Sequence, residues 1–335
     1  MRRRGIGAAL LAGVLTLGLT APALADPAIP GDPQVEEQTE DHAPLADPVV
    51  SLPLDRLGGE DRYETSARIS WSAFQRGADT VYLARGDVFA DAIAAGSLTD
   101  GPVLLVRSCG SVPAAVRAEI ARVDPVQVVA LGGPTSICDT TLEAAANGRP
   151  TDRVDGADRF DTAALIAARA FPEGAGTVYL AEHLNSVDAV AGGTLTDGPV
   201  LLVRNGSTTV PQRTLEAIEA LNPTEVVALG GPVVVTDQAL TAAAGTRHTD
   251  RVAGDDRYAT SAAIAARAFP HGSSRTYLAN GSSVADAVVG GVLTRGPILL
   301  VPGTCRVVTE PVWRRVATHP PDKVVALGGK SAVCS

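Results

Sequence analysis

The chain repeats one pattern three times at a spacing of about 97 residues, and this repetition limits its fold more than any other feature. Every copy contains, in the same order, an arginine, an Asp-Arg pair, a Tyr-Leu-Ala run, a Gly-Pro-(Val/Ile)-Leu-Leu run and a closing Leu-Gly-Gly turn. Because these motifs keep their spacing in all three copies, we expect three copies of one structural unit. The Asp-Arg pairs are Asp61-Arg62, Asp158-Arg159 and Asp256-Arg257.

Within the first copy, short apolar runs alternate with stretches of helical periodicity. The apolar runs are rich in Val and Leu, which is typical of strands buried on both faces. Strict alternation of strand and helix predicts right-handed crossovers and a mainly parallel sheet. We therefore predict an α/β fold made of three tandem Rossmann-like repeats. The predicted strands are 80–84, 102–106 and 126–131, and the predicted helices are 63–74, 91–98 and 112–123.

Nine of the twelve aromatic residues fall at three positions that recur in every copy. We expect them to form the core, and the alternative is an exposed platform on which sugar rings stack. They are Tyr63, Phe160 and Tyr258; Phe74, Phe171 and Phe269; and Tyr82, Tyr179 and Tyr277. In the first copy, the periodicity predicts one buried helical face that carries Tyr63, Ala67, Ser70, Trp71 and Phe74.

The N-terminus has the pattern of a secretory signal peptide. Arginines at positions 2–4 precede an apolar run from Ile6 to about Leu19, and the small-residue site Ala23-Leu24-Ala25 follows. This small-residue site predicts cleavage after Ala25. The apolar run is too short for a membrane-spanning helix, and a retained N-terminal anchor is the alternative. The expected location is therefore outside the cytoplasm, with no membrane span.

A linker rich in proline and acidic residues is predicted between the signal and the repeats. Cleavage of the signal would leave 25 Lys and Arg against 37 Asp and Glu, a net charge near −12. Such an acidic chain is unsuited to general binding of nucleic acid, which needs a basic surface. The predicted segments are the signal peptide at 1–25, the linker at 26–52, and the repeats at 53–150, 151–248 and 249–335.

Taken together, the motifs of each copy resemble the bacterial cell-wall-binding repeat type 2. The resemblance covers nearly the whole chain after the linker. It implies that three repeats pack with pseudo-threefold symmetry and hold a surface protein non-covalently on an anionic secondary cell-wall polymer. We expect no cofactor, no metal and no catalytic residue. The family's Ile-Leu-Leu element matches 103–105, 200–202 and 298–300, so that the candidate ligand-binding leucines are Leu104, Leu105, Leu201, Leu202, Leu299 and Leu300.

The second copy departs from the family pattern in one loop. It has Glu182-His183-Leu184 where the first and third copies have Arg85-Gly86-Asp87 and Asn280-Gly281-Ser282. We expect the binding surface of the second copy to be altered or lost.

The repeated Asp-Arg pair is the most informative charged feature. The aspartate can cap the first helix, but the arginine after it then faces the positive end of the helix dipole and needs a fixed partner. That partner is either a carboxylate of the same copy or an anionic group of the ligand. The candidate residues are the arginines Arg62, Arg159 and Arg257 with the aspartates Asp91, Asp188 and Asp286.

The four cysteines fall as equivalent pairs in the first and third copies, each 29 residues apart. Both members of a pair follow strands that we expect to emerge at the same edge of a parallel sheet, and an exported chain permits disulfides. We predict the bridges Cys109–Cys138 and Cys305–Cys334. The second copy has Gly206 and Thr236 at these positions.

Two other classes of function remain open beside wall attachment. One is a wall-turnover enzyme of the amidase or peptidase class, which would need activity within the repeats, because little chain lies outside them; the other is a self-assembling coat. The Leu-Gly-Gly turns are not followed by a nucleotide-binding motif. The five histidines occupy no repeated position, so neither a zinc site nor a serine triad is supported. We favour a monomer with an internal pseudo-trimer.

Overall fold

In a computed structural model of the chain, the described residues are 54–333, with gaps at 89–92, 184–190, 284 and 304–307. The predicted signal peptide and linker lie outside them. The structure contains three four-stranded sheets, and every strand pairing in them is parallel. The predicted α/β class and the threefold repetition are therefore confirmed. No helix of the described residues has the length and apolar character needed to cross a membrane.

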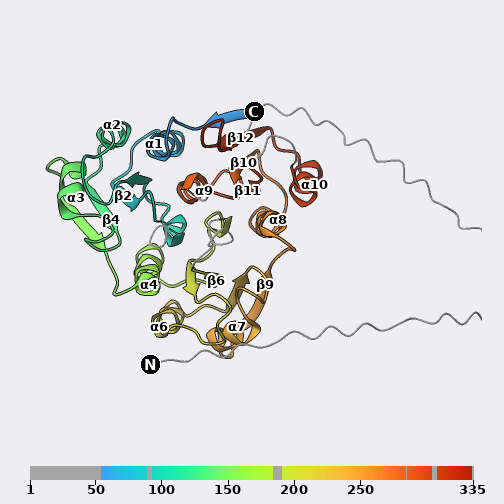
Figure 1. The fold of residues 1–335 in the computed structure, drawn as a ribbon. Coiled ribbons are helices and arrows are strands. Elements are labelled where there is room, and N and C mark those ends of the chain that lie inside the picture. The colour runs from blue at the N-terminus through green and yellow to red at the C-terminus, as the bar shows by residue number, and fades with distance from the viewer. Residues whose placement is uncertain (1–53, 89–92, 184–190, 284, 304–307, 334–335) are drawn as a thin grey trace, which may run out of the picture. The chain divides into compact units, whose positions relative to one another are not determined.

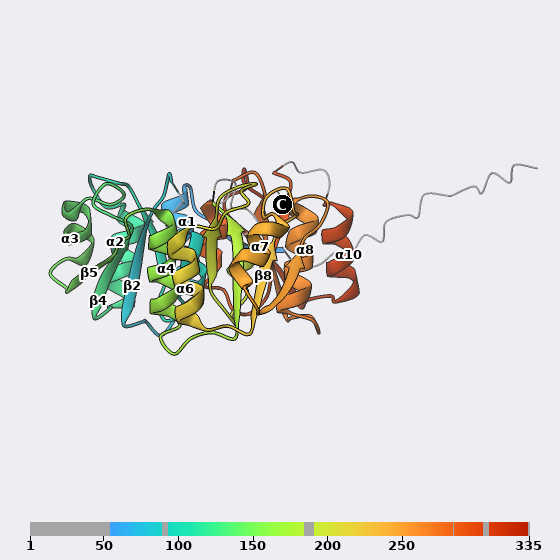
Figure 2. The ribbon, with the colours of Figure 1, turned by 90° about the horizontal axis from the view of Figure 1, so that it is seen from below.

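The first sheet has the strand order β3-β2-β4-β5. Strands β2, β3 and β4 are buried on both faces, which explains their continuous apolar sequence. Figure 2 shows β2, β4 and β5 side by side, with α3 near them. The elements are α1 (Arg62–Ala73), β2 (Thr80–Arg85), η1 (Ile93–Ser97, a 3-10 helix), β3 (Val103–Val106), α2 (Ala114–Val123), β4 (Gln127–Leu131), α3 (Asp139–Ala146) and β5 (Thr151–Val154).

The second and third sheets repeat this order. The second sheet has the order β7-β6-β8-β9. The elements of its unit are α4 (Arg159–Ala170), β6 (Thr177–Glu182), β7 (Val200–Val203), α6 (Gln212–Leu221), β8 (Glu225–Leu229), α7 (Asp237–Ala244) and β9 (His248–Val252). The third sheet has the order β11-β10-β12-β1. The elements of its unit are α8 (Arg257–Ala268), β10 (Arg275–Asn280), α9 (Ala285–Gly290), β11 (Ile298–Val301), α10 (Glu310–Thr318), β12 (Lys323–Leu327) and β1 (Leu54–Leu57).

Each sheet takes its edge strand from the next copy of the sequence repeat. Strand β5 opens the second copy but pairs with β4 of the first, and β9 opens the third copy but pairs with β8 of the second. Strand β1 closes the cycle by pairing with β12, with Leu54 beside Val324 and Leu57 beside Leu327. Figure 1 shows this contact between the blue start and the red end of the described chain. The three units are therefore joined into a closed ring.

The centre of the ring is a shared apolar core. One cluster of buried side chains includes residues from all three copies, among them Tyr82, Tyr179 and Tyr277. The three copies approach one another most closely at equivalent glycines. A Cβ added to Gly96 would lie 2.6 Å from Cα of Gly193, and one added to Gly291 would lie 2.8 Å from Cα of Gly96. Only glycine allows the backbones to come so close at the pseudo-threefold axis.

Trp71 was expected on the buried face of the first helix, and this prediction is wrong. Its side chain is 55% exposed. The buried residues of helix α1 are Thr65, Ser66, Ala67, Ile69 and Ser70, so the buried face is centred to one side of Trp71. The hydroxyl of Ser66 accepts a hydrogen bond from the Leu105 amide (3.1 Å). This close approach turns Trp71 away from the sheet.

The bridge between Cys109 and Cys138 is present, with their Cα atoms 5.2 Å apart, as predicted. Cys305 and Cys334 lie outside the described residues. In the second copy, Thr236 replaces the bridge with a hydrogen bond from its hydroxyl to the carbonyl of Ser207 (2.8 Å). One hydrogen bond therefore serves at the position of a covalent link.

We expect a Cys109→Ala/Cys138→Ala variant to fold but to lose stability. The second copy folds without a bridge, whereas releasing a loop of this size costs about 3–4 kcal/mol in the chain-entropy treatment. Urea unfolding of the variant and the oxidised wild type measures the difference. Wild type treated with reductant is the control and should be no more stable than the variant, because reductant also breaks the predicted Cys305–Cys334 bridge. Equal stability of all three samples would show that the bridge does not stabilise the fold.

Candidate functional site

The candidate site is the edge of the sheets where the parallel strands end, which is the usual place for ligands in such sheets. The first helix of each copy begins at this edge. As predicted, its aspartate caps it: the carboxylate of Asp61 accepts a hydrogen bond from the Glu64 amide, and that of Asp256 from the Ala259 amide, both at 2.8 Å. Asp158 accepts from the amides of Phe160 and Asp161. The cap fixes the following arginine at the first position of each helix.

The structure gives these arginines a partner that the sequence did not suggest. Nη1 of Arg62 donates to the Gly86 carbonyl (2.5 Å), and Nη1 of Arg257 donates to the Gly281 carbonyl (2.7 Å). A carbonyl dipole offsets part of the unfavourable placement at the helix start. A guanidinium carries five N–H groups, so an arginine that donates to a carbonyl can also donate to a second acceptor.

The glycine in this loop is required by the ring beside it. A Cβ on Gly86 would lie 2.8 Å from Cε1 of Tyr63, and a Cβ on Gly281 would lie 2.7 Å from Cε1 of Tyr258. In the second copy His183 takes the place of this glycine, and its ring lies 5.2 Å from that of Phe160, which lacks the tyrosine hydroxyl. The altered loop that the sequence indicated is therefore accompanied by a matching change in the helix.

We predict that Gly86→His destabilises the chain by about 1–3 kcal/mol, because the new side chain overpacks the space beside Tyr63. The matched control is His183→Gly, which makes the reciprocal exchange in the second copy and adds no atom. Urea unfolding should show the larger loss for Gly86→His. If the two substitutions have the same effect, the glycine is not required by this packing.

Of the three aspartates that were candidate partners of the arginines, Asp286 lies among the described residues, whereas Asp91 and Asp188 lie outside them. It is 8% exposed, and burial raises the pKa of its carboxyl, while Arg62 and a hydrogen bond from Thr65 act in the opposite direction. Arg62 and Thr65 belong to the first copy and Asp286 to the third. The partner was expected within the same copy, so this expectation is corrected for Asp286. The contact brings the carboxyl edges of two neighbouring units together.

The predicted leucines all lie in the core. Leu104, Leu105, Leu201, Leu202, Leu299 and Leu300 are each 0% exposed. Their backbone nevertheless holds the helices that begin at the edge. The Leu105 amide donates to the Ser66 hydroxyl of α1, and the Leu300 amide donates to the Ser261 hydroxyl of α8 (3.0 Å). The motif thus positions the arginines indirectly.

A second set of arginines holds the Leu-Gly-Gly turns, and sequence reasoning did not assign it this role. Nη1 of Arg153 donates to the Gly132 carbonyl and Nη1 of Arg251 to the Gly230 carbonyl, both at 2.6 Å. Arg56 donates to the carbonyls of Gly328 (2.8 Å) and Gly329 (3.0 Å). Each arginine stands on the edge strand that joins the preceding unit. The turns need glycine because the backbone φ is positive, at 91° to 96°, at Gly132, Gly230 and Gly328.

Further cations lie near the same edge in the first two copies. The guanidinium of Arg107 lies over the Tyr63 ring, 5.2 Å from its centroid, and that of Arg204 lies 5.0 Å from the Phe160 centroid. The third copy has Pro302 at this position. At this position the first and second copies therefore each carry a cation that the third copy lacks.

Comparison with known proteins identifies a family and distant relatives. The family described as cell wall binding domain 2 (CWB2) matches residues 56–142, 153–240 and 251–335. The chain is 26% identical over 245 residues to N-acetylmuramoyl-L-alanine amidase LytC of Bacillus subtilis, covering 72% of this chain and 48% of the amidase. It is 24% identical over 243 residues to the amidase enhancer of the same organism, covering 71% of this chain and 33% of the enhancer.

Two solved structures share the fold. Cwp6 from Clostridium difficile superposes with a TM-score of 0.75 at 24% identity, covering 83% of this chain and 46% of that one. Cwp8 from the same organism superposes with a TM-score of 0.73 at 21% identity, covering 83% and 49%. The chain spans half or less of the length of each of these four proteins.

Proposed function

The chain belongs to the cell wall binding domain 2 family, and on that premise we propose that its three repeats attach it to the bacterial cell wall by binding an anionic secondary cell-wall polymer. The observation that supports this most directly is the recurrence of an arginine at the first position of a capped helix, in each copy and at the same sheet edge. Three such positions around one axis suit a polymer whose anionic groups repeat.

Charge supports a local rather than a general attraction. The chain carries a net charge of −9, so a polyanion is repelled by the molecule as a whole and must be held by fixed guanidinium groups. We propose that Arg62, Arg159 and Arg257 supply these groups, and that Asp286 and its counterparts Asp91 and Asp188 help to orient them. The buried leucines of the Leu-Leu motif contribute by holding the helices in place.

Attachment to a wall requires export, and we propose that residues 1–25 direct it as a cleaved signal peptide. The mature protein would then act at the cell surface, held without a covalent bond. Its thiols would meet an oxidising environment, in keeping with the bridge between Cys109 and Cys138.

Purified cell walls provide the test. The mature chain should sediment with walls at low salt, and the retained fraction should fall as salt is raised, because ion pairs with a polyanion are screened. Retention that does not change between about 0.05 and 1 M salt would contradict a polyanion as the ligand.

The alternative is an enzyme of wall turnover. The names of the two Bacillus relatives, an amidase and an amidase enhancer, suggest this alternative. We propose that the part they share with this chain binds the wall and does not cleave it. Zymography on purified peptidoglycan distinguishes the two functions. A cleared band at the position of this chain would favour the enzyme.

A further inference from the structure

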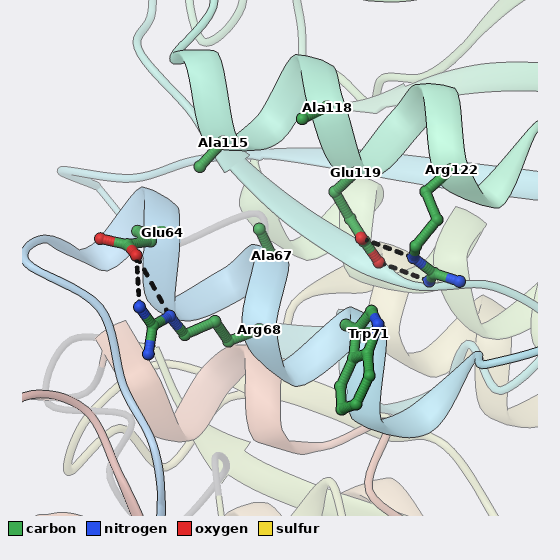
Figure 3. Close-up of a pocket in the computed structure, with 8 residues that line it drawn as sticks. All are labelled: Glu64, Ala67, Arg68, Trp71, Ala115, Ala118, Glu119 and Arg122. Carbon is green, nitrogen blue, oxygen red and sulfur yellow. Dashed lines mark hydrogen bonds and ion pairs between the residues drawn. The ribbon is translucent and has the colours of Figure 1, made fainter.

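The first copy has an open groove between α1 and α2 that has no assigned role. Its volume is about 310 Å³, and Figure 3 shows the side chains that line it. Trp71 of α1 lies at one end, and the floor is formed by the small side chains of Ala67, Ala115 and Ala118. The exposed indole and the small alanine side chains leave the apolar surface of the groove open to solvent.

Two ion pairs border this surface. Glu64 pairs with Arg68 at 2.7 Å, and Glu119 pairs with Arg122 at 2.6 Å. Glu119 is 6% exposed and is further fixed by a hydrogen bond from the Ser70 hydroxyl (2.5 Å). Glu64, Arg68 and Arg122 are therefore the charged groups that a ligand at the border can reach, and the formal charges of the two pairs cancel.

The side chains that form this groove in the first copy are not repeated in the second. The positions that match Trp71 hold Ala168 and Ala266 in the other two copies. In the second copy, Ala115 is replaced by Arg213, which pairs with Asp161 and with Glu216, both at 2.7 Å. Glu216 itself stands at the position that matches Ala118. Long charged side chains thus occupy, in the second copy, the place that alanines leave open in the first.

We propose that this groove binds an uncharged pyranose unit of a glycan. A sugar ring has one apolar face of C–H groups that stacks on an indole, and hydroxyl groups at its rim that bond to carboxylates and guanidinium groups. The balanced charges of the two ion pairs suit a neutral sugar better than an anionic group. The site is separate from the arginine edge, so it goes beyond the proposed binding of an anionic polymer.

The geometry explains why this role falls to Trp71 and not to the aromatics that recur in every copy. Tyr82, Tyr179 and Tyr277 are at most 1% exposed, so a sugar cannot reach their faces, and the other six recurring aromatics are buried or only partly exposed. Trp71 is absent from the repeated pattern and, within the part of the chain that the structure describes, it is the aromatic with the large exposed surface.

Tryptophan fluorescence gives a direct test, because Trp71 and Trp313 are the only two tryptophans of the sequence. In a Trp313→Phe background, Trp71 should report on its own groove. Neutral oligosaccharides, tri-N-acetylchitotriose and maltotriose, are titrated into the full chain, with a short uncharged proline-rich peptide as the competing ligand class. We expect a saturable change in Trp71 emission with at least one of the oligosaccharides.

The matched variant is Ala115→Arg, which places in the first copy the side chain that fills the groove in the second. It should weaken oligosaccharide binding at least about tenfold, as should Trp71→Ala when binding is measured by calorimetry. Both positions are at the surface, and circular dichroism checks the fold. The proposal is overturned if neither sugar binds at concentrations up to about 20 mM, which is the limit for detecting millimolar affinity. It is also overturned if Ala115→Arg leaves sugar binding unchanged, or if only the peptide binds. Retention on walls through the arginine edge is measured separately, and its loss or survival does not bear on this site.

Discussion

A fragment of residues 54–150 should fail to fold as the complete chain does, and it should show no cooperative thermal transition. In this fragment β1 has lost its partner β12, and β4 has lost its partner β5. The face that meets the other two copies at Gly96 would also be exposed to water. A small α/β unit that loses an edge strand and part of its core has little stability left.

The fragment of residues 59–154 is the matched control, because it has nearly the same length but keeps β5 on its own sheet. It still exposes the central apolar surface, so we expect weak stability or association instead of the stability of the whole chain. Circular dichroism and sedimentation of both fragments, beside residues 54–335, measure the difference. A monomeric 54–150 fragment that melts as cooperatively as residues 54–335 would contradict the closed ring.

The junction between the third and first units lacks the arginine found at the other two junctions. At those junctions an arginine crosses to a buried tyrosine: Nε of Arg169 donates to the Tyr82 hydroxyl, and Nε of Arg267 donates to the Tyr179 hydroxyl, both at 3.1 Å. The first copy has Ser72 at the matching position. At this junction β1 pairs with β12, Arg56 donates to the turn carbonyls, and Lys323 pairs with Asp55 at 3.1 Å.

A triple variant with Arg62, Arg159 and Arg257 changed to Gln should lose wall retention by tenfold or more while remaining folded. The three sites would act together on a repeating polymer, so each single substitution should have a smaller effect than the triple change. Some loss of melting temperature is expected, because Arg62 and Arg257 each donate to a glycine carbonyl. Glutamine keeps a donor but removes the charge.

The comparison that separates binding from stability is a second triple variant, with Arg56, Arg153 and Arg251 changed to Gln. These arginines hold the Leu-Gly-Gly turns, so their loss should lower the melting temperature more than the first triple change does. Where the second variant remains folded, it should still bind walls. Unchanged retention in a well-folded variant of the first set would remove those arginines from the binding surface.

Much of the fold could be predicted because its signals are local. The buried strands have continuous apolar sequences, the caps have an aspartate before the helix, and the cysteines have equivalent spacing. The strands that join the preceding unit, β1, β5 and β9, were missed for the same reason. Strand β5 is Thr-Asp-Arg-Val, with only its last residue buried, so it has no apolar run to detect. Its pairing with the preceding copy depends on contacts that no local pattern records.

The candidate site was predicted less completely, because its geometry arises between copies. The pattern identified Arg62 and Asp286, but the approach of Asp286 to Thr65 and Arg62 across two units requires the ring to be closed. The glycine carbonyl that receives the Arg62 hydrogen bond is a backbone group and leaves no side-chain signal. Trp71 matched the helical period of the core, yet the small residues of α1 already fill the contact with the sheet.

The most direct test of wall attachment compares binding to two preparations of the same walls. Purified chain is mixed with intact walls and with walls from which the anionic secondary polymer has been extracted, and the bound fraction is measured by sedimentation. We predict strong, salt-sensitive retention on intact walls and loss of most of it on extracted walls, with recovery when the isolated polymer is tested as a soluble competitor. Equal retention on both preparations would contradict the anionic polymer as the ligand of the three repeats.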